Sequence, residues 1–372
     1  MRVGRHAWVD IDLSAVGNNV RALSAHVAPA RLCAVVKADG YGHGAVEVSR
    51  AVLDAGAEWL AVALPEEGRA LREAGIEAPI LLLSEPDPDS FAEVMEADLR
   101  PTLYTASGIE ACARAVEAFG RSPCPAHLKV NTGMNRVGAD PSDALEMAVA
   151  VRAQPSLSLE GVWTHCAVAD EPGNPFTALQ LERLEKVLAE LGTAGVEIPL
   201  VHAANSAAAI AHPESRYDMV RCGISVYGIA PSPALDGILP LQPAMSVRAE
   251  VGFVKRVRVG EAVSYGLSHR FERDTSVATV PLGYADGVPR RLYECGGEVL
   301  VGGGRRSVVG AVTMDQFMVD VGGDPVRAGD EVVLMGSQGN EAITAQDWAS
   351  WLGTIAYEVV CGFGPRLPRR YR

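Results

Sequence analysis

Short apolar segments rich in Val, Leu and Ile alternate with helix-like stretches between residue 31 and about residue 221. This alternation is typical of parallel β-strands that are connected by helices. It predicts eight strands, over residues 32–37, 59–63, 79–83, 100–103, 126–131, 157–164, 198–202 and 218–221. An open doubly wound sheet usually has about five or six strands, so the pattern favours a (β/α)8 TIM-like barrel.

After about residue 235 the pattern changes to β-rich segments separated by glycine turns. Strands are expected within residues 244–258, 275–282, 298–301, 306–312, 317–320 and 331–334. Residues 230–240 contain three prolines and are expected to form the hinge. We therefore predict an α/β barrel over residues 1–235 and a mostly antiparallel β domain over residues 236–372, with about the first ten residues as candidates for packing with the β domain.

Local signals predict the ends of two elements. Ser107 and Glu110 have the spacing of a capping box at a helix start, and Gly120 stands where a left-handed stop is expected. The glycines at 302–304 precede two arginines but no GK[ST] triplet, so they predict a hairpin turn rather than a phosphate loop.

Composition narrows the class of protein. With 33 basic and 46 acidic residues, the net charge of −13 disfavours a nucleic acid or an anionic membrane as partner. No apolar run approaches the ~18 residues of a transmembrane helix, and the start has no apolar signal segment. The seven cysteines contain no CxxC pair. These features predict a cytoplasmic protein without a disulfide framework or a metal site.

Barrels concentrate their chemistry at the carboxyl ends of the strands. The polar residues expected there are Lys37, Arg136, His165, His202, Asn205, Ser206 and Arg221. Lys37 closes an apolar run, where loss of solvent can make an amine nucleophilic and suited to bond a carbonyl compound such as pyridoxal phosphate. The alternative is a surface lysine. Gly223 follows Arg221 after the eighth strand, where barrels often bind phosphate through backbone amides.

A series of motifs resembles the alanine racemase family across essentially the whole chain. In the barrel they are AVVKADGYGHG (34–44), KVNTGMNRVG (129–138), THCAVADEPG (164–173), HAANSAA (202–208) and MVRCGISVYG (219–228). In the β domain they are VSYGLSH (263–269), PLGYADGVPR (281–290), TMDQFMVDVG (313–322) and TIAYEVV (354–360). The resemblance implies a barrel followed by a β domain, pyridoxal 5′-phosphate as cofactor, and a homodimer with composite active sites.

The resemblance also implies roles for single residues. Lys37 would bind the pyridoxal aldehyde and act as base on one face of the substrate, and Tyr265 of the partner subunit would be the base on the other face. Two opposed bases suit racemisation, because one removes the α-proton and the other returns a proton from the far side. Arg221 would face the pyridine nitrogen, with His165 and His202 linking this arginine and the tyrosine.

Further assignments follow from the same resemblance. The phosphate and the rest of the cofactor would meet Tyr41, Asn205, Ser206, Gly223, Ile224 and Tyr357. The substrate carboxylate would meet Arg136 and the amide of Met314, with Asp315 nearby and Tyr284 at the entrance. Lys129 matches a lysine that is carboxylated in several members, although Asn131 replaces the aspartate usual in that segment.

The expected activity is therefore interconversion of L- and D-alanine, which supplies D-alanine for peptidoglycan. Racemisation of serine or another small amino acid is the nearest alternative, since one methyl group changes binding by only ~1–3 kcal/mol. A non-catalytic pyridoxal phosphate carrier is a second alternative, but it would need neither a β domain nor Tyr265. A decarboxylase of the same architecture would require different motifs.

Overall fold

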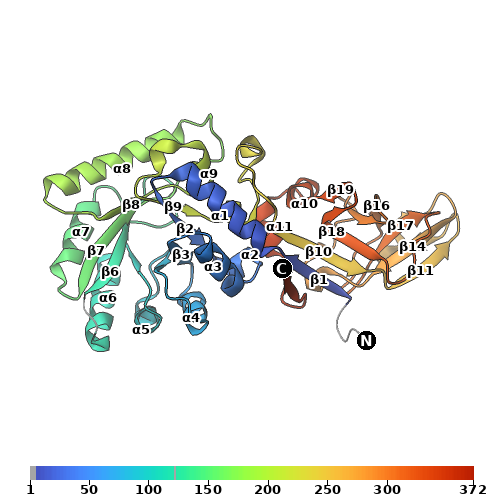
Figure 1. Ribbon diagram of the computed structural model, residues 1–372, viewed down its shortest axis with the longest axis horizontal. Helices are drawn as coiled ribbons and strands as arrows, with labels where there is room; N and C mark the ends of the chain where they lie inside the picture. The colour runs from blue at the N-terminus through green and yellow to red at the C-terminus, as the bar shows by residue number, and fades with distance from the viewer. Residues whose placement is uncertain (1–5, 121–122) are drawn as a thin grey trace. The chain divides into compact units, whose positions relative to one another are not determined.

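The computed structural model describes residues 6–120 and 123–372, which form two compact units (Figure 1). The barrel unit comprises Ser14–Gly40 and Ala45–Pro243. The β unit comprises residues 6–13 of the described chain, Tyr41–Gly44 and Ala244–Arg372. The division along the chain thus falls between Pro243 and Ala244, whereas the sequence pattern predicts 235/236. The short segment Tyr41–Gly44 belongs to the β unit although barrel segments flank it on both sides.

All eight predicted barrel strands are present. They are β2 (Arg31–Val35), β3 (Trp59–Val62), β4 (Ile80–Leu82), β5 (Thr102–Leu103), β6 (Cys124–Lys129), β7 (Leu157–Trp163), β8 (Leu200–His202) and β9 (Met219–Cys222). They form two parallel four-stranded sheets, β4-β3-β2-β9 and β5-β6-β7-β8.

Two sets of contacts close these sheets into a barrel. A parallel bridge pairs Leu81 of β4 with Arg100, just before β5. At the other junction the N–H of Asp218 donates to Val201 at 3.1 Å and the N–H of Arg221 donates to Ala204 at 2.9 Å, which joins β9 to β8. The predicted (β/α)8 barrel is therefore confirmed, and all its strands point the same way.

Helices connect and cover the strands, as Figure 1 shows for the blue-to-yellow part of the chain. They are α1 (Leu13–Val27), α3 (Ala45–Asp54), α4 (Pro65–Glu73), α5 (Phe91–Glu96), α6 (Ala106–Phe119), α7 (Ala144–Ala153), α8 (Phe176–Thr193) and α9 (Ser206–Ala211). In α8 the residues Leu181, Leu184 and Leu191 are buried along one stripe. Burial of such stripes against the strands stabilises the barrel more than helix propensity does.

The start of α6 differs from the prediction. Thr105 is the N-cap, and its side chain accepts from the N–H of Gly108 at 2.9 Å, so Ser107 lies inside the helix. Glu85 decides this start, because its carboxylate accepts from the N–H groups of Tyr104 and Thr105. The predicted capping box was therefore wrong. The predicted stop is confirmed, since Gly120 has φ 70° and ends the helix in the left-handed conformation.

The β unit contains one large sheet. Its strands run in the order β11-β14-β17-β16-β15-β18-β10-β1-β20, and β19 pairs with β18. They are β1 (Ala7–Ile11), β10 (Met245–Glu250), β11 (Phe253–Val257), β14 (Thr275–Val280), β15 (Glu298–Val301), β16 (Gly304–Val309), β17 (Phe317–Gly322), β18 (Glu331–Gln338), β19 (Glu341–Ile343) and β20 (Arg369–Tyr371). Most pairs are antiparallel, as predicted, and β1 with β20 is the parallel exception. A small hairpin, β12 (Ala262–Val263) with β13 (His269–Arg270), and two helices, α10 (Ala345–Leu352) and α11 (Ala356–Cys361), complete the unit.

Several strands of this unit were not predicted, and one predicted segment contains two strands. The stretch 244–258 forms two strands, because the chain leaves the sheet at Val251 and Gly252. The strands β1, β12, β13, β19 and β20 have no counterpart among the predicted segments. Residues 7–11 enter the sheet between β10 and β20, which comes from the far end of the chain. Residues 1–5, which belong to the stretch expected to pack with this domain, lie outside the described residues.

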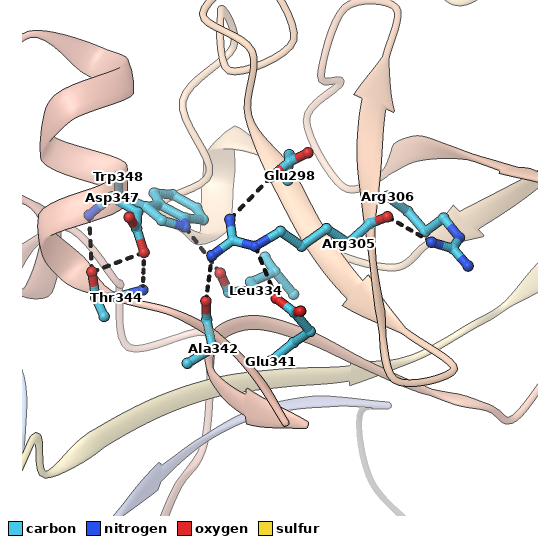
Figure 2. Close-up of polar contacts among 9 residues, drawn as sticks. All are labelled: Glu298, Arg305, Arg306, Leu334, Glu341, Ala342, Thr344, Asp347 and Trp348. Carbon is cyan, nitrogen blue, oxygen red and sulfur yellow. Dashed lines mark hydrogen bonds and ion pairs between the residues drawn. The ribbon is translucent and has the colours of Figure 1, made fainter. Parts of the chain in front are cut away.

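The predicted hairpin at 302–304 is confirmed. Gly302 and Gly303 have φ 61° and 79° and connect β15 to β16, whose residues Val301 and Gly304 pair directly. Positive φ at both central residues matches the tight turn that follows the twist of the strands. Figure 2 shows Arg305, next along β16, reaching Glu298 of β15 at 3.0 Å and Glu341 of β19 at 3.3 Å. These partly exposed ion pairs link three strands.

Two further features bear on the class of protein. No helix in the described part of the chain has the length and apolar character that crossing a bilayer requires. All seven cysteines are free thiols.

Candidate active site

The polar residues predicted at the barrel mouth follow the carboxyl ends of their strands. Arg136 lies in the loop after β6, His165 follows β7, His202 ends β8 and Arg221 lies near the end of β9. Because all strands of a closed parallel barrel end on the same rim, these side chains converge there. Lys37 stands two positions beyond β2, which ends at Val35, so it belongs to the rim loop rather than to the strand.

The loop after Lys37 is a left-handed turn. Ala38, Asp39 and Gly40 have φ of 53°, 52° and 61°, and Tyr41 has φ 53°. This region costs a residue other than glycine about 1–2 kcal/mol, so other contacts must hold the turn. The N–H of Ala38 donates to Glu67 at 2.6 Å, and the N–H of Ala45 donates to Asp39 at 2.9 Å. Strain of this kind concentrates at functional sites, and here it directly follows Lys37.

Arg221 is a buried cation whose contacts are all with neutral groups. Its side chain is 2% exposed. It donates to His202 Nδ1 at 2.8 Å and to the carbonyls of Thr164 and Ala203 at 2.8 and 3.1 Å. His165 Nδ1 lies 3.3 Å away, and the guanidinium stacks over the Trp163 ring at 4.4 Å. Burial lowers the pKa of Arg221 to about 10, so it stays protonated at neutral pH.

The same contacts settle the protonation of both predicted histidines. Burial, and then repulsion from Arg221, holds the pKa of His202 and of His165 well below 6.5, so both rings are neutral. A guanidinium only donates, so the Nδ1 that faces it must accept. Both rings therefore carry their proton on Nε2. They support Arg221 from two sides without competing with it for charge.

Lys129 lies against the same tryptophan. Its Nζ is 4.2 Å from the centre of the Trp163 ring and 3.4 Å from the carbonyl of Leu83. The pKa of Lys129 is lowered to about 7, first by burial and then by repulsion from Arg221, Arg136 and Lys37. A substantial share of this amine is therefore unprotonated at neutral pH. Four basic residues are thus close enough to influence one another at the rim.

Arg136 is exposed and lies in a loop that Asn131 shapes. The side-chain oxygen of Asn131 accepts from the N–H groups of Asn135 at 2.9 Å and Gly133 at 3.3 Å. Arg136, Lys129 and His165 line one pocket together with residues of this loop. The asparagine that departs from the family pattern therefore turns the loop that presents Arg136.

The donors at the rim fit an anionic ligand with a phosphate group. Within residues 6–120 and 123–372, Lys129, Arg136 and Arg221 form no ion pair with a carboxylate. Beyond β8 and β9, Gly223 donates to the hydroxyl of Ser206 at 2.9 Å. The backbone N–H groups of Ser206, Ala207, Ile224 and Ser225 meet no acceptor in the described residues. The buried Ser225 hydroxyl also has no partner among them. Such a set can bind a phosphate dianion mainly through neutral donors.

Asn205 caps the helix that begins beside these donors. Its side-chain oxygen accepts from the N–H of Ala208 at 3.0 Å, and its amide donates to the carbonyl of Cys166 at 3.2 Å. Both hydrogen-bonding ends of Asn205 are therefore used within the barrel. The residue fixes the start of α9, and with it the orientation of Ser206.

The remaining predicted residues lie in the β unit, and four of them, Asp315 included, are exposed. The exposed fractions of Tyr265, Met314 and Tyr284 are 73%, 54% and 45%. Their loops adjoin, because the N–H of Tyr284 donates to Thr313 and the hydroxyl of Ser264 donates to Ala311. We call residues 264–267, 283–286 and 311–315 the exposed loops.

Two further contacts organise the predicted residues of the β unit. Arg366 pairs with Asp315 at 2.6 Å and with the buried carboxylate of Asp286 at 3.3 Å, which ties together two of the exposed loops. The rings of Tyr41 and Tyr357 are tilted against each other with centroids 6.3 Å apart. Asp315 therefore has a fixed arginine partner within its own unit.

Comparison with known proteins gives matches along almost the whole chain. Residues 11–231 match the model of the N-terminal domain of alanine racemase, and residues 244–371 match that of its C-terminal domain. The chain belongs to the alanine racemase family.

Individual members of the alanine racemase family agree with this at full length. An alanine racemase of Symbiobacterium thermophilum is 49% identical over 99% of this chain and 97% of its own. The crystal structure of alanine racemase from D-cycloserine-producing Streptomyces lavendulae is 42% identical, with a TM-score of 0.94 over 100% and 98% of the two chains. A histidine racemase of Leuconostoc mesenteroides is 32% identical, with a TM-score of 0.91 over 100% and 99%.

The sequence reasoning missed two residues that contact the predicted ones, Trp163 and His127, and a third, Glu160, that contacts His127. Trp163 lies under both Arg221 and Lys129, and His127 and Glu160 continue the contacts of His202. A signal for His127 existed, because it precedes Lys129 by two positions in a strand and must therefore face the same side. Glu160 had no such signal.

Proposed function

We propose that this protein interconverts L- and D-alanine with pyridoxal 5′-phosphate as cofactor, acting as a homodimer in the cytoplasm and supplying D-alanine for peptidoglycan. The match at 49% identity over the full chain to a protein named alanine racemase carries this proposal. The cationic rim of the barrel, with its unused phosphate donors, supports the cofactor. Seven free cysteines suit a reducing compartment.

When bound, the cofactor withdraws electrons from the α-carbon and so acidifies its proton. In our proposal Lys37 would bind the cofactor aldehyde, while Ser206 and the amides of Gly223 and Ile224 would bind its phosphate, which would take the place of the Ser206 hydroxyl as acceptor for Gly223. The family resemblance adds Tyr41, Tyr357 and Asn205 to the cofactor contacts. Arg221 donates to the ring nitrogen. Because its guanidinium stays protonated, it can only donate, so a ring nitrogen held there would remain an unprotonated acceptor; this would limit electron withdrawal and disfavour side reactions.

Proton transfer is assigned to Lys37 and to Tyr265 of the partner subunit, one on each face of the α-carbon. Tyr265 is 73% exposed in the single chain. A catalytic base must be positioned beside the proton that it transfers, so the exposure of Tyr265 supports a site that is completed by a second subunit. Exposed Leu267 and Met314 accompany it at 61% and 54%. Apolar surface of this kind, next to a proposed catalytic group, fits a surface that a second copy covers.

The substrate carboxylate is assigned to Arg136 and to the amide of Met314. The N–H of Met314 meets no acceptor within residues 6–120 and 123–372, so it can donate to a ligand. Asp315 orients this loop through its pair with Arg366. Tyr284 is assigned to the entrance, where its partly exposed ring limits the size of the side chain that enters.

Lys129 is proposed to carry a carboxylate derived from carbon dioxide. An amine with a pKa of about 7 is available to attack CO2, and the reaction forms an N–C bond and releases one proton. The product is an anion. The side chain of Lys129 would then attract Arg136 and Arg221, whereas the ammonium form repels them. Asn131 maintains the loop around Arg136 by hydrogen bonds to backbone N–H groups, which does not require an aspartate.

The decisive experiment incubates the purified protein, loaded with pyridoxal phosphate, with pure L-alanine in D2O. We expect the two enantiomers to approach equal amounts while deuterium enters at the α-carbon. L-Serine and L-histidine run in parallel, because the chain resembles a histidine racemase as well as alanine racemases. Turnover of serine or histidine in preference to alanine would move the assignment to that substrate. Cofactor binding without turnover of any amino acid would favour the alternative of a non-catalytic pyridoxal phosphate carrier.

Lys37→Ala tests the assignment of the cofactor lysine. Loss of the covalent link should abolish the visible absorption of bound cofactor, and loss of the proposed base should lower turnover by at least about 10²–10⁴-fold. Lys255→Ala, which removes an exposed lysine of the β unit, is the matched control and should change neither. A chromophore that persists in Lys37→Ala and still reacts with borohydride would show that another lysine binds the cofactor.

A further inference from the structure

A chain of hydrogen bonds leads from Arg221 through the barrel to a single carboxylate. Arg221 lies 2.8 Å from Nδ1 of His202. Nε2 of His202 lies 2.9 Å from Nδ1 of His127. Nε2 of His127 lies 3.1 Å from Oε2 of Glu160. We call Arg221, His202, His127 and Glu160 the histidine chain.

The two ends of the histidine chain force all its hydrogen bonds to point the same way. The guanidinium of Arg221 can only donate, and the carboxylate of Glu160 can only accept. His202 must therefore accept on Nδ1 and donate from Nε2, and His127 must do the same. Each ring has one available tautomer, and no bond in the chain is left with two donors or two acceptors.

The backbone is shaped to bring Glu160 to this position. Between β6 and β7 the pairing shifts, so that Ala126 faces Leu159 but His127 faces Gly161. Glu160 is the extra residue of this bulge, and bulges re-aim side chains near active sites. Gly161 completes the arrangement. A Cβ at Gly161 would lie 2.6 Å from Nδ1 of His127, so only glycine leaves room for the ring.

The surroundings of the histidine chain keep its two rings neutral and immobile. Both rings are fully buried. His202 is stacked on Trp163 at 5.5 Å with 12° between the planes, and His127 meets the edge of Trp59 at 5.6 Å. Burial lowers the pKa of both rings, although Glu160 acts in the opposite direction on His127. Glu160 is 26% exposed and pairs with Arg100 at 3.4 Å, so the negative charge stays at the partly solvated end.

We propose that Glu160 and His127 are positioning residues for Arg221: from the Nε2 side they stabilise the tautomer of His202 whose Nδ1 accepts from the guanidinium, and they thereby hold Arg221 in one orientation at the barrel rim. That this orientation serves the cofactor ring rests on the proposed function. The fixed tautomers follow from the contacts of this chain alone. A buried arginine without a carboxylate beside it is thereby coupled to a carboxylate two rings away.

The first arm of the test measures the tautomers directly in cofactor-free protein. Solid-state NMR of protein labelled with ¹⁵N in its histidines, assigned with His127→Gln and His202→Gln, should show both rings protonated on Nε2. Glu160→Ala should shift the ring signals of His127 and also those of His202, which Glu160 does not touch. Glu160→Gln should restore them, because a carboxamide oxygen still accepts. A proton on Nδ1 of either ring, or unchanged His202 signals in Glu160→Ala, would overturn the proposal.

The second arm measures the affinity for pyridoxal phosphate by titration of its visible absorption. Loss of an outer hydrogen-bond partner typically costs about 10–100-fold in affinity or activity at metal sites, and we expect a loss towards the lower end of that range for Glu160→Ala. Glu298→Ala is the matched control, since Glu298 is 31% exposed and pairs with Arg305 in the other unit. Equal affinities of both variants and the parent would show that Glu160 has no role in cofactor binding. If the parent itself binds no cofactor, the proposed function fails, while the first arm still decides the tautomers.

Discussion

The barrel rim and the exposed loops of the β unit differ in how far their predicted functional residues are buried. At the rim, Arg221 and His202 are buried, and their hydrogen bonds go to other residues of the barrel unit, most of them buried. On the exposed loops, Tyr265 and Met314 present more than half of their surface to solvent. A buried charge must be compensated where it lies, because transfer from water without a partner costs several kcal/mol. An exposed tyrosine needs no such compensation and is free to be completed by a second copy.

The comparison is tested most strongly at Tyr265. Tyr265→Phe removes one hydroxyl and keeps the ring that we assign to the dimer surface. We expect removal of the α-proton of L-alanine to slow by about 10²–10⁴-fold, with a smaller effect on D-alanine, because the variant loses only one of two bases. Deuterium exchange at the α-carbon of each enantiomer measures this. Tyr371→Phe, at another exposed tyrosine of the β unit, is the control. Equal losses for both enantiomers would contradict the two-base assignment.

Substitution of one arginine in each unit tests how strongly burial determines its contribution to the free energy of unfolding. Arg221→Ala removes the guanidinium donor from Nδ1 of His202 and from the buried carbonyls of Thr164 and Ala203, and leaves Ala203 only the weak contact of the Cys166 thiol at 4.0 Å. At about 1–3 kcal/mol for each unsatisfied group, the free energy of unfolding should fall by at least about 3 kcal/mol. Arg305→Ala also removes several contacts, but to partly exposed partners (Figure 2), so it should cost about 1 kcal/mol or less. Urea unfolding of cofactor-free protein compares them, and similar losses would show that burial does not distinguish the two sites.

Lys129 predicts a pH dependence of stability in the barrel unit. Its pKa is about 7 in the folded state against 10.5 for an ordinary lysine, so between these values the unfolded chain binds one more proton. Stability should therefore rise with pH across this window, by up to about 1.4 kcal/mol per pH unit from this group. Lys129→Met should remove that rise, and it should be the more stable protein at pH 7 in buffer free of CO2.

The measurement is urea unfolding of both proteins from pH 7 to pH 10, with and without bicarbonate. Carboxylation should remove the titrating amine, so bicarbonate should flatten the difference for the parent. Identical pH profiles of the parent and of Lys129→Met without CO2 would refute the lowered pKa.

Two glycines of the barrel unit test whether the effect of an added Cβ on stability depends on the space around it. At Gly161 a new Cβ meets the His127 ring, and it also comes within 2.9 Å of the Leu200 carbonyl. Gly161→Ala should lower the free energy of unfolding by about 1–3 kcal/mol through overpacking. At Gly192, inside α8, nothing lies within 4 Å of the new atom, so Gly192→Ala should raise it by about 0.5–1 kcal/mol. Chemical denaturation measures both changes, and a loss at Gly192 as large as that at Gly161 would show that the effect is not local.

Much of the barrel could be predicted because its strands are short apolar runs between helices, a signal that depends only on local sequence. The β unit was less predictable. Residues 7–11 pair with strands more than 230 positions away, and no local pattern announces such a partner. The start of α6 failed for a related reason, since Glu85 selects Thr105 as the cap from 20 residues away. Contacts distant in sequence overrode acceptable local alternatives.

For this protein, the order of its motifs was sufficient to indicate the family, the two-domain architecture and the candidate residues at the ends of the strands. Periodicity carries that information because burial imposes it on every strand and helix. Only the tertiary structure showed that one bulge aims Glu160 at His127 and that a single direction of hydrogen bonding runs from there to Arg221. A bulge breaks the alternation from which side-chain direction is inferred, so the partners of Arg221 emerge only when the strands are paired.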